Sequence, residues 1–98
     1  MTDLEQLELM TDSLVHGRIP WSVARKMSGD VARLSERTGN YGFIRLMLVS
    51  GGNAASVAIS ALDLCPALPS DMKEHVARHL DHSRLETRNM AMSLLDEM

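Results

Sequence analysis

The fold is decided by a stretch that occurs in two versions, FIRLMLVSGGNAASVAISALDLC at residues 43–65 and VARHLDHSRLETRNMAMSLLDEM at residues 76–98. The versions lie 33 positions apart and share six identities in 23 aligned positions, whereas average composition would give about one or two. The identical pairs are Arg45/Arg78, Ser50/Ser83, Ala58/Ala91, Ser60/Ser93, Leu62/Leu95 and Asp63/Asp96. A period of this length is typical of stacked helix pairs, because one pair cannot bury its apolar face alone. We therefore expect residues 43–98 to form two antiparallel helical hairpins packed side by side.

The composition favours a helical chain. Its 98 residues suit one domain with one modest core. Aromatic residues make up only 3% of the chain, so the core must consist of Leu, Val, Ile, Ala and Met, a mixture that favours helices over β-sandwiches. We predict a single all-α domain over residues 1–98, a small helical bundle in which two N-terminal helices precede the two stacked hairpins.

The two N-terminal helices have recognisable boundaries. Thr2 begins the first as its capping residue, Glu5 completes a capping box, and Gly17 ends the helix. A second helix is predicted over residues 20–37, because an apolar stripe recurs there at helical spacing, made by Val23, Met27, Val31 and Leu34. Gly29 lies near its middle and costs about 1 kcal/mol relative to Ala, which leaves open whether the helix is continuous at that point.

The hairpins are punctuated by turn signals. Residues 41–49 are apolar nearly all round and match a strand by length alone. Their copy at 71–80 is plainly helical, so we predict a helix, the central and most enclosed one. Residues 50–53 form a turn, and residues 66–69, Pro-Ala-Leu-Pro, separate the hairpins. Ser83 is expected to cap the last helix in a second capping box.

The two predicted hairpins resemble HEAT-type, or armadillo-type, helical repeats over residues 40–98. The residues that carry the resemblance are Leu80-Asp81, Thr87-Arg88, Ala91 and Leu94-Leu95. Thr87 stands where the family usually has Val. The resemblance implies a right-handed stack of antiparallel helix pairs that binds proteins, less often nucleic acid, and it does not imply catalysis.

The net charge of −3 conceals an acidic–basic–acidic pattern. Residues 1–17 carry four acids and no Lys or Arg, residues 18–45 carry six bases against two acids, and residues 46–98 carry four bases against seven acids. On one helix Arg25, Lys26, Arg33 and Arg37 would form a basic ridge. Three interpretations stay open: a solvated face paired with the acidic first helix, a surface for an acidic protein, or a nucleic-acid surface. A sequence pI of 5.7 and the lack of aromatics among these bases argue against nucleic acid.

The last helix is rich in methionine and runs to the final residue without a terminating signal. Stacked repeats normally finish with a polar cap. Met90, Met92 and Met98 are therefore either core residues or a contact surface, including one for self-association through the C-terminal helix.

Few side chains in the sequence are candidates for catalysis or metal binding. His75, His79 and His82 recur on one flank of a helix, where they are half-buried spacers, metal ligands or a pH-sensitive contact. No phosphate-binding glycine motif, nucleophile–base pair or paired carboxylates stand out, so we expect no catalysis, cofactor or metal site. The lone Cys65 is expected to be a small buried hydrophobe.

The sequence predicts a cytoplasmic protein that binds other macromolecules. The chain shows no signal peptide and no run of about 18 apolar residues, so we expect a cytoplasmic protein without a membrane partner. The prediction is a non-catalytic protein–protein interaction module, a small regulatory protein such as an adaptor, chaperone-like partner or inhibitor, that binds through a helical-repeat face. The alternative is nucleic-acid binding through the basic ridge of residues 18–45.

Overall fold

The computed structural model describes residues 1–65 and 69–98, and these two ranges contain helices and no strand. The predicted all-α fold is confirmed. In chain order the elements are α1 (Asp3–His16), α2 (Trp21–Ala24), η1 (Arg25–Met27), α3 (Ser28–Thr38), α4 (Gly42–Ser50), α5 (Gly52–Leu64), η2 (Ser70–Met72), α6 (Lys73–Ala77) and α7 (Leu85–Glu97), where η marks a 3₁₀-helix. The predicted break at residues 66–69 falls largely outside the described residues.

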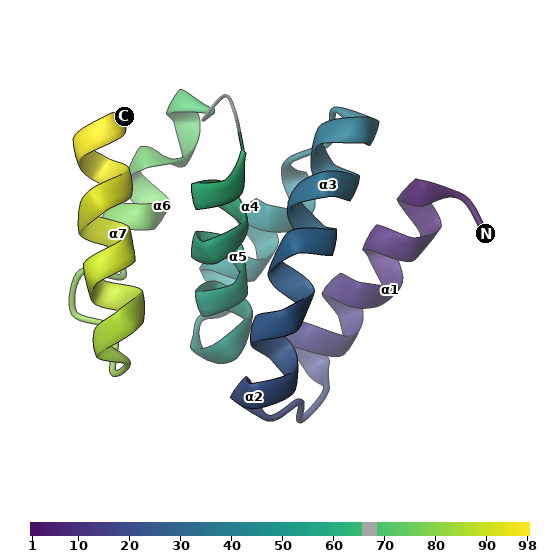
Figure 1. Ribbon diagram of the computed structural model, residues 1–98, viewed down its shortest axis with the longest axis horizontal. Helices are drawn as coiled ribbons and strands as arrows, with labels where there is room; N and C mark the ends of the chain where they lie inside the picture. The colour runs from purple at the N-terminus through teal and green to yellow at the C-terminus, as the bar shows by residue number, and fades with distance from the viewer. Residues whose placement is uncertain (66–68) are drawn as a thin grey trace.

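The helices form two layers. In Figure 1, α3, α5 and α7 stand side by side in front and run in the same direction, while α1, α4 and α6 run the opposite way. Each front helix packs against a back helix, in the pairs α1 with α3, α4 with α5 and α6 with α7. The two hairpins and the preceding N-terminal helices therefore pack as expected. Helices α5 and α7 also have the same length of 13 residues, and α7 begins and ends 33 positions after α5. That the helix pairs are HEAT-type repeats stays a prediction.

The boundaries of α1 are those that the sequence predicts. The backbone N–H of Glu5 donates to Thr2 Oγ1 at 3.1 Å, and the backbone N–H of Thr2 donates to Glu5 Oε1 at 3.3 Å, which completes the capping box. Gly17 ends the helix and donates its N–H to the carbonyl of Ser13 at 2.9 Å. A Cβ at position 17 would overlap that carbonyl oxygen, so this close approach requires glycine.

The second N-terminal helix is continuous at Gly29 but changes its winding earlier. Gly29 lies inside α3, whereas the three residues of η1 adopt 3₁₀ geometry. A 3₁₀ turn has fewer residues per turn than an α-helix and therefore rotates the side chains that follow it. Val31 and Leu34 are buried, but Val23 of the predicted apolar stripe is 52% exposed.

The enclosed helix is α5, and the prediction that residues 41–49 are the most enclosed is wrong. Helix α5 lies between α3, α4 and α7, and its buried residues include the unbroken run 54–59. Its alanines let these neighbours approach closely. Helix α4 occupies the back layer, and Leu46 and Val49 remain 48% and 61% exposed. An apolar run does not reveal which layer a helix will occupy.

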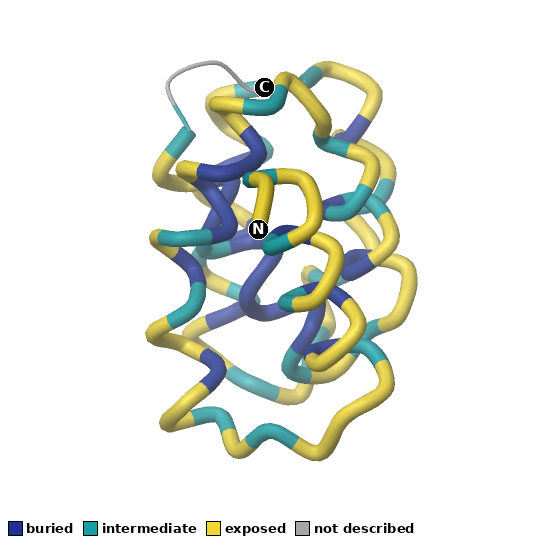
Figure 2. Tube along the Cα trace, turned by 90° about the vertical axis from the view of Figure 1, so that its right-hand side faces the viewer, coloured by how far each residue is buried: buried dark blue, intermediate teal, exposed yellow. Residues whose placement is uncertain are grey.

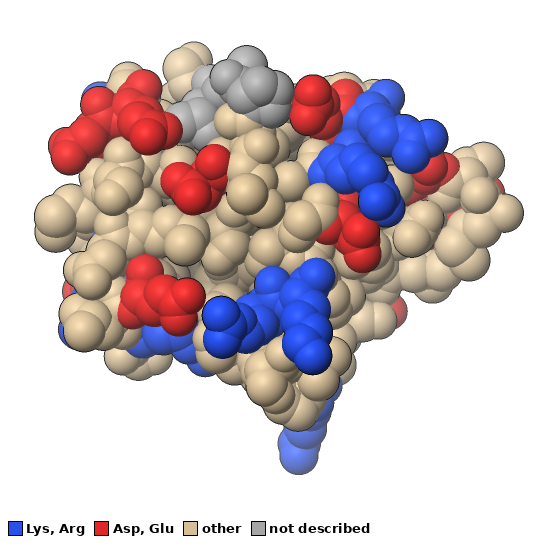
Figure 3. All heavy atoms as spheres, in the orientation of Figure 1, with Lys and Arg blue, Asp and Glu red and all other residues tan. Residues whose placement is uncertain are grey.

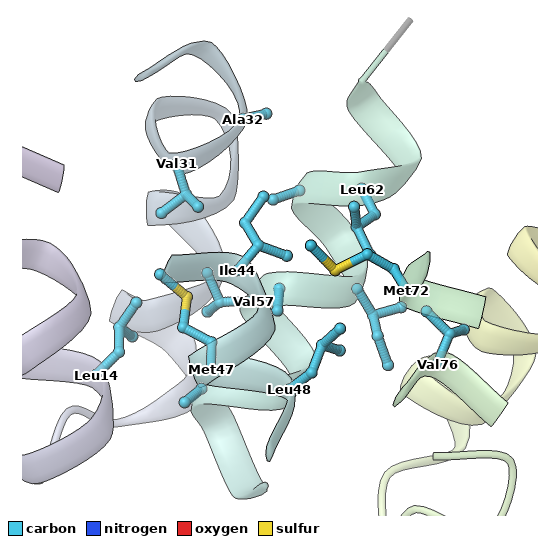
Figure 4. Close-up of a cluster of buried hydrophobic side chains, with 14 of the residues drawn as sticks. Leu14, Val31, Ala32, Ile44, Met47, Leu48, Val57, Leu62, Met72 and Val76 are labelled. Carbon is cyan, nitrogen blue, oxygen red and sulfur yellow. The ribbon is translucent and has the colours of Figure 1, made fainter. Parts of the chain in front are cut away.

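The core lies between the two layers and continues from α1 to α7. Figure 2 shows buried positions along the inner sides of the helices and exposed positions around them. Figure 4 shows side chains from separate elements converging, among them Leu14 of α1, Val31 of α3, Met47 of α4, Val57 of α5 and Val76 of α6. The described helices include none that is long and apolar enough to cross a lipid bilayer.

The start of α7 differs from the prediction. Arg84, not Ser83, precedes the helix, and no side chain caps it. The backbone N–H of Arg84 instead donates to Nδ1 of His82 at 3.0 Å. The predicted second capping box is therefore wrong, and the ring of His82, not the hydroxyl of Ser83, accepts from the backbone at the start of the helix.

Candidate protein-binding surfaces

The predicted basic ridge is divided in the structure. Arg25 and Lys26 lie in η1, whereas Arg33 and Arg37 lie on α3, and all four are exposed. Nη2 of Arg33 is 3.1 Å from Oδ1 of Asp30, and Nη2 of Arg37 is 3.1 Å from Oδ2 of Asp3. Figure 3 shows the Lys and Arg side chains of this face in separate groups, with acidic side chains beside the group over α3.

Of the three methionines that the sequence marks as core residues or a contact surface, only Met92 is well exposed, at 57%. Met90 and Met98 are half-buried and pack against the core. Leu85, also on α7, is 60% exposed, and it precedes Met92 by seven residues, or about two helical turns. Helix α7 therefore has one exposed apolar face, made by Leu85 and Met92.

Two of the three predicted histidines, His79 and His82, join the second hairpin to the first. Nε2 of His79 lies 2.8 Å from the carbonyl oxygen of Leu48, and Nε2 of His82 lies 3.2 Å from that of Gly52. Because Nδ1 of His82 accepts from Arg84, its Nε2 carries the hydrogen that is donated to Gly52. Over residues 1–65 and 69–98, no three His, Cys, Asp or Glu side chains are arranged to hold a metal ion.

A polar cluster around Arg84 joins α2, α5 and α7, and no sequence pattern predicts it. Nη1 of Arg84 donates to Ser56 Oγ at 2.7 Å, and Nη2 donates to Asn53 Oδ1 at 2.8 Å. The guanidinium carbon lies 4.1 Å from the centre of the Trp21 ring, which is cation–π geometry. The hydroxyl of Ser56 also lies 2.8 Å from that of Thr87. These contacts join three helices, so the cluster stabilises their packing.

Asn53 shows why the cluster is invisible in the sequence. Gly51 precedes α5, and Asn53 lies inside the helix, where its side chain does not cap the helix start. The side-chain amide of Asn53 instead donates to the carbonyl oxygen of Ile19 at 2.9 Å. Its partners are more than 30 positions away on both sides, and no local pattern connects them.

A groove of about 220 Å³ runs between α1 and α4. Its lining residues are Glu8, Thr11, Asp12, Val15 and His16 of α1, with Phe43 and Leu46 of α4. Val15 and Phe43 are half-buried and pack against the core, and Leu46 is 48% exposed, so these three side chains give the groove an apolar floor.

The rim of this groove is acidic. Glu8 makes no ion pair within the described part of the chain, and the nearest base to Asp12 is His16, at 3.9 Å, with both side chains well exposed. The carboxylates are therefore available to a partner. The signal for this groove in the sequence is the apolar excess of residues 41–49, which we interpreted as burial.

A second groove, of about 340 Å³, lies between α5 and α7. Met90 lines it together with Asp63, Glu86, Asn89 and Ser93. Four of the five lining residues are polar or charged, so Met90 is the one apolar side chain that this groove offers to a partner. It is a weaker candidate for a protein segment than the groove between α1 and α4.

The lone cysteine lies apart from both grooves. Burial, and secondarily the charge of Glu36, raise the pKa of the Cys65 thiol above its ordinary value. Burial likewise raises the pKa of Tyr41, with Cys65 and Glu36 adding to the effect. The Cys65 thiol donates to the carbonyl oxygen of Ala61 at 3.2 Å. A half-buried thiol with a raised pKa is a poor nucleophile at neutral pH.

Comparisons with protein-family models, with curated proteins and with solved structures find no match to this chain.

Proposed function

We propose that this chain is a non-catalytic protein–protein interaction module, a small adaptor, chaperone-like partner or inhibitor, that binds a segment of its partner in the groove between α1 and α4. The observation that carries the proposal is the combination of an apolar floor, made by Val15, Phe43 and Leu46, with an acidic rim made by Glu8 and Asp12. We also propose that the chain acts in the cytoplasm and that its helix pairs form a HEAT-like stack.

The apolar floor supplies the attraction. Leu46 and Val49 are exposed on a helix that already contributes Ile44, Met47 and Leu48 to the core. Covering the exposed half of a leucine side chain is worth about 1 kcal/mol. A partner that inserts one apolar side chain against Phe43 and Leu46 gains this energy, and exposed apolar patches bounded by polar residues are typical of protein-binding sites.

The acidic rim selects the partner. Carboxylates beside an apolar groove attract Lys and Arg and repel acidic segments, and such charges control specificity and association rate more than affinity. The partner segment is therefore an amphipathic helix or strand with an apolar anchor and basic flanks.

The nucleic-acid alternative has less support. Arg33 and Arg37 are both engaged by carboxylates of this chain, which leaves Arg25 and Lys26 of the predicted ridge outside ion pairs among the described residues. A gel shift with single-stranded and duplex nucleic acid at low salt tests the alternative, since phosphate binding is strongest there. A shift that Arg25→Glu and Lys26→Glu abolish would favour it over the protein-binding proposal.

The test of the proposal is comparative capture from cell extract. Wild type, Leu46→Asp and the control Val23→Asp are immobilised, because Val23 is similarly exposed, at 52%, but lies on α2. We expect proteins held by wild type and by Val23→Asp to be lost from Leu46→Asp, and their binding segments to carry Lys or Arg beside an apolar residue. Capture that Leu46→Asp leaves unchanged, or a mapped segment that is acidic, would contradict the proposal.

A further inference from the structure

The outer side of α7 is the end of the front layer. Its packing neighbours in the described part of the chain are α5 and α6, which cover the side that buries Thr87, Ala91 and Leu94 (Figure 1). The opposite side presents Leu85 and Met92. This face is separate from the groove between α1 and α4, and the inference from it does not depend on the proposed function.

Two charges flank Met92 on this exposed face. Arg88 precedes it by four residues and Asp96 follows it by four, so both lie within about 40° of Met92 around the helix at 100° per residue. Arg88 is partly exposed and Asp96 is exposed, and neither makes an ion pair within residues 1–65 and 69–98. The face therefore carries a positive and a negative charge on opposite sides of an apolar centre.

We propose that a second copy of this chain covers this face, with the two α7 helices packed antiparallel and a two-fold axis beside Met92. In this arrangement Met92 contacts Met92 of the second copy. Arg88 of each copy lies at the same level as Asp96 of the other, so opposite charges meet twice. A two-fold interface requires such a self-complementary surface.

The charges also exclude the parallel arrangement. Parallel α7 helices would place Arg88 beside Arg88 and Asp96 beside Asp96, and like charges in contact oppose association. Because the face is a single helix with few apolar side chains, the dimer interface is small. The dimer therefore forms reversibly and at high protein concentration.

Sedimentation velocity over a concentration series tests the dimer. We expect wild type to change from monomer to dimer as its concentration rises, and Met92→Asp to remain monomeric. The control Val23→Asp, on α2, should dimerise like wild type. Wild type that stays monomeric throughout the series, or a dimer that Met92→Asp leaves intact, would overturn the proposal.

A charge exchange tests the orientation. Arg88→Asp and Asp96→Arg should each weaken dimerisation by about tenfold, because each substitution places like charges opposite one another. The double variant restores opposite pairs and should return dimerisation to near the wild-type value. Both substitutions suit the α7 dipole, with an acid near its start and a base near its end, so circular dichroism should show an intact helix. A double variant as weak as the single variants would overturn the antiparallel arrangement.

Discussion

Arg84 shows how one side chain can hold several helices together. Its guanidinium donates to Ser56 and Asn53 of α5 and stacks on Trp21 of α2, while its own backbone begins α7. A planar group with two parallel donors makes these contacts together, whereas the ammonium group of lysine is a single point and cannot.

Replacing Arg84 should therefore lower the free energy of unfolding. We expect Arg84→Ala to cost about 1–3 kcal/mol, because Ser56 and Asn53 lose their hydrogen-bond donor, and Arg84→Lys to recover only part of that loss. Urea denaturation measures the difference. The exposed Arg78→Ala is the control and should change stability by less than about 0.5 kcal/mol. If Arg84→Lys were as stable as wild type, the two-donor account of this residue would be wrong.

The thiol of Cys65 ionises less readily in the folded chain than in the unfolded chain, because it is half-buried. Its ordinary thiol pKa is 9.0, and burial, aided by Glu36, raises the pKa in the folded chain. The folded state therefore favours the protonated thiol. This contribution to stability is complete below pH 9.0 and is lost as the pH rises through the higher folded pKa.

Alkylation of Cys65 with iodoacetamide measures this shift, because only the thiolate reacts. The rate should rise with pH around a higher midpoint in the folded protein than in urea. Glu36→Gln should move the folded midpoint only part of the way towards the unfolded one, since burial is the larger cause. Equal midpoints in the two states would show that Cys65 is not shielded.

At the scale of elements, two glycines show how far the backbone constrains the sequence. Gly51, between α4 and α5, has φ of 75° and ψ of −169°, a backbone conformation that residues other than glycine rarely adopt. Gly29 lies inside α3, and a Cβ there would meet nothing within 4 Å. The same substitution should therefore have opposite effects at the two positions.

We expect Gly51→Ala to lower the free energy of unfolding by about 1–3 kcal/mol, because the backbone would be strained. Gly29→Ala should raise it by about 0.5–1 kcal/mol, since alanine loses less conformational freedom in a helix. Thermal and urea denaturation of both variants measure the two signs. A destabilising Gly29→Ala would mean that the chain around η1 and α3 is not helical as described.

The elements also show what a sequence pattern can and cannot predict. The capping box at Thr2 and Glu5 is local, and it was found where the pattern placed it. The one at Ser83 failed, because the His82 ring bonds the backbone of Arg84 and no local pattern encodes that contact. The match to residues 71–80 predicted a helix for α4, but the apolar content of residues 41–49 did not reveal its layer, since layer assignment depends on contacts with α1 and α5.

At the scale of the whole molecule, several large apolar side chains remain outside the core. The row of helix pairs encloses α5, and leaves Leu46 and Val49 on the back layer and Leu85 and Met92 at the end of the row. The sequence singled out Met92 but not the groove between α1 and α4, because that groove requires Glu8 and Asp12 to lie beside Phe43 and Leu46 in space. The groove between α1 and α4 is the basis for proposing a binding protein, and the exposed face of α7 is the basis for proposing a dimer.

The most direct test of that claim is photo-crosslinking in cells from Leu46. A photoreactive phenylalanine analogue is placed at position 46 in one variant and at Val23 in another, two positions of similar exposure on different helices. We expect discrete adducts of this chain with another protein from position 46 and none from position 23. Position 46 yielding no adduct, or the same adducts as position 23, would contradict it.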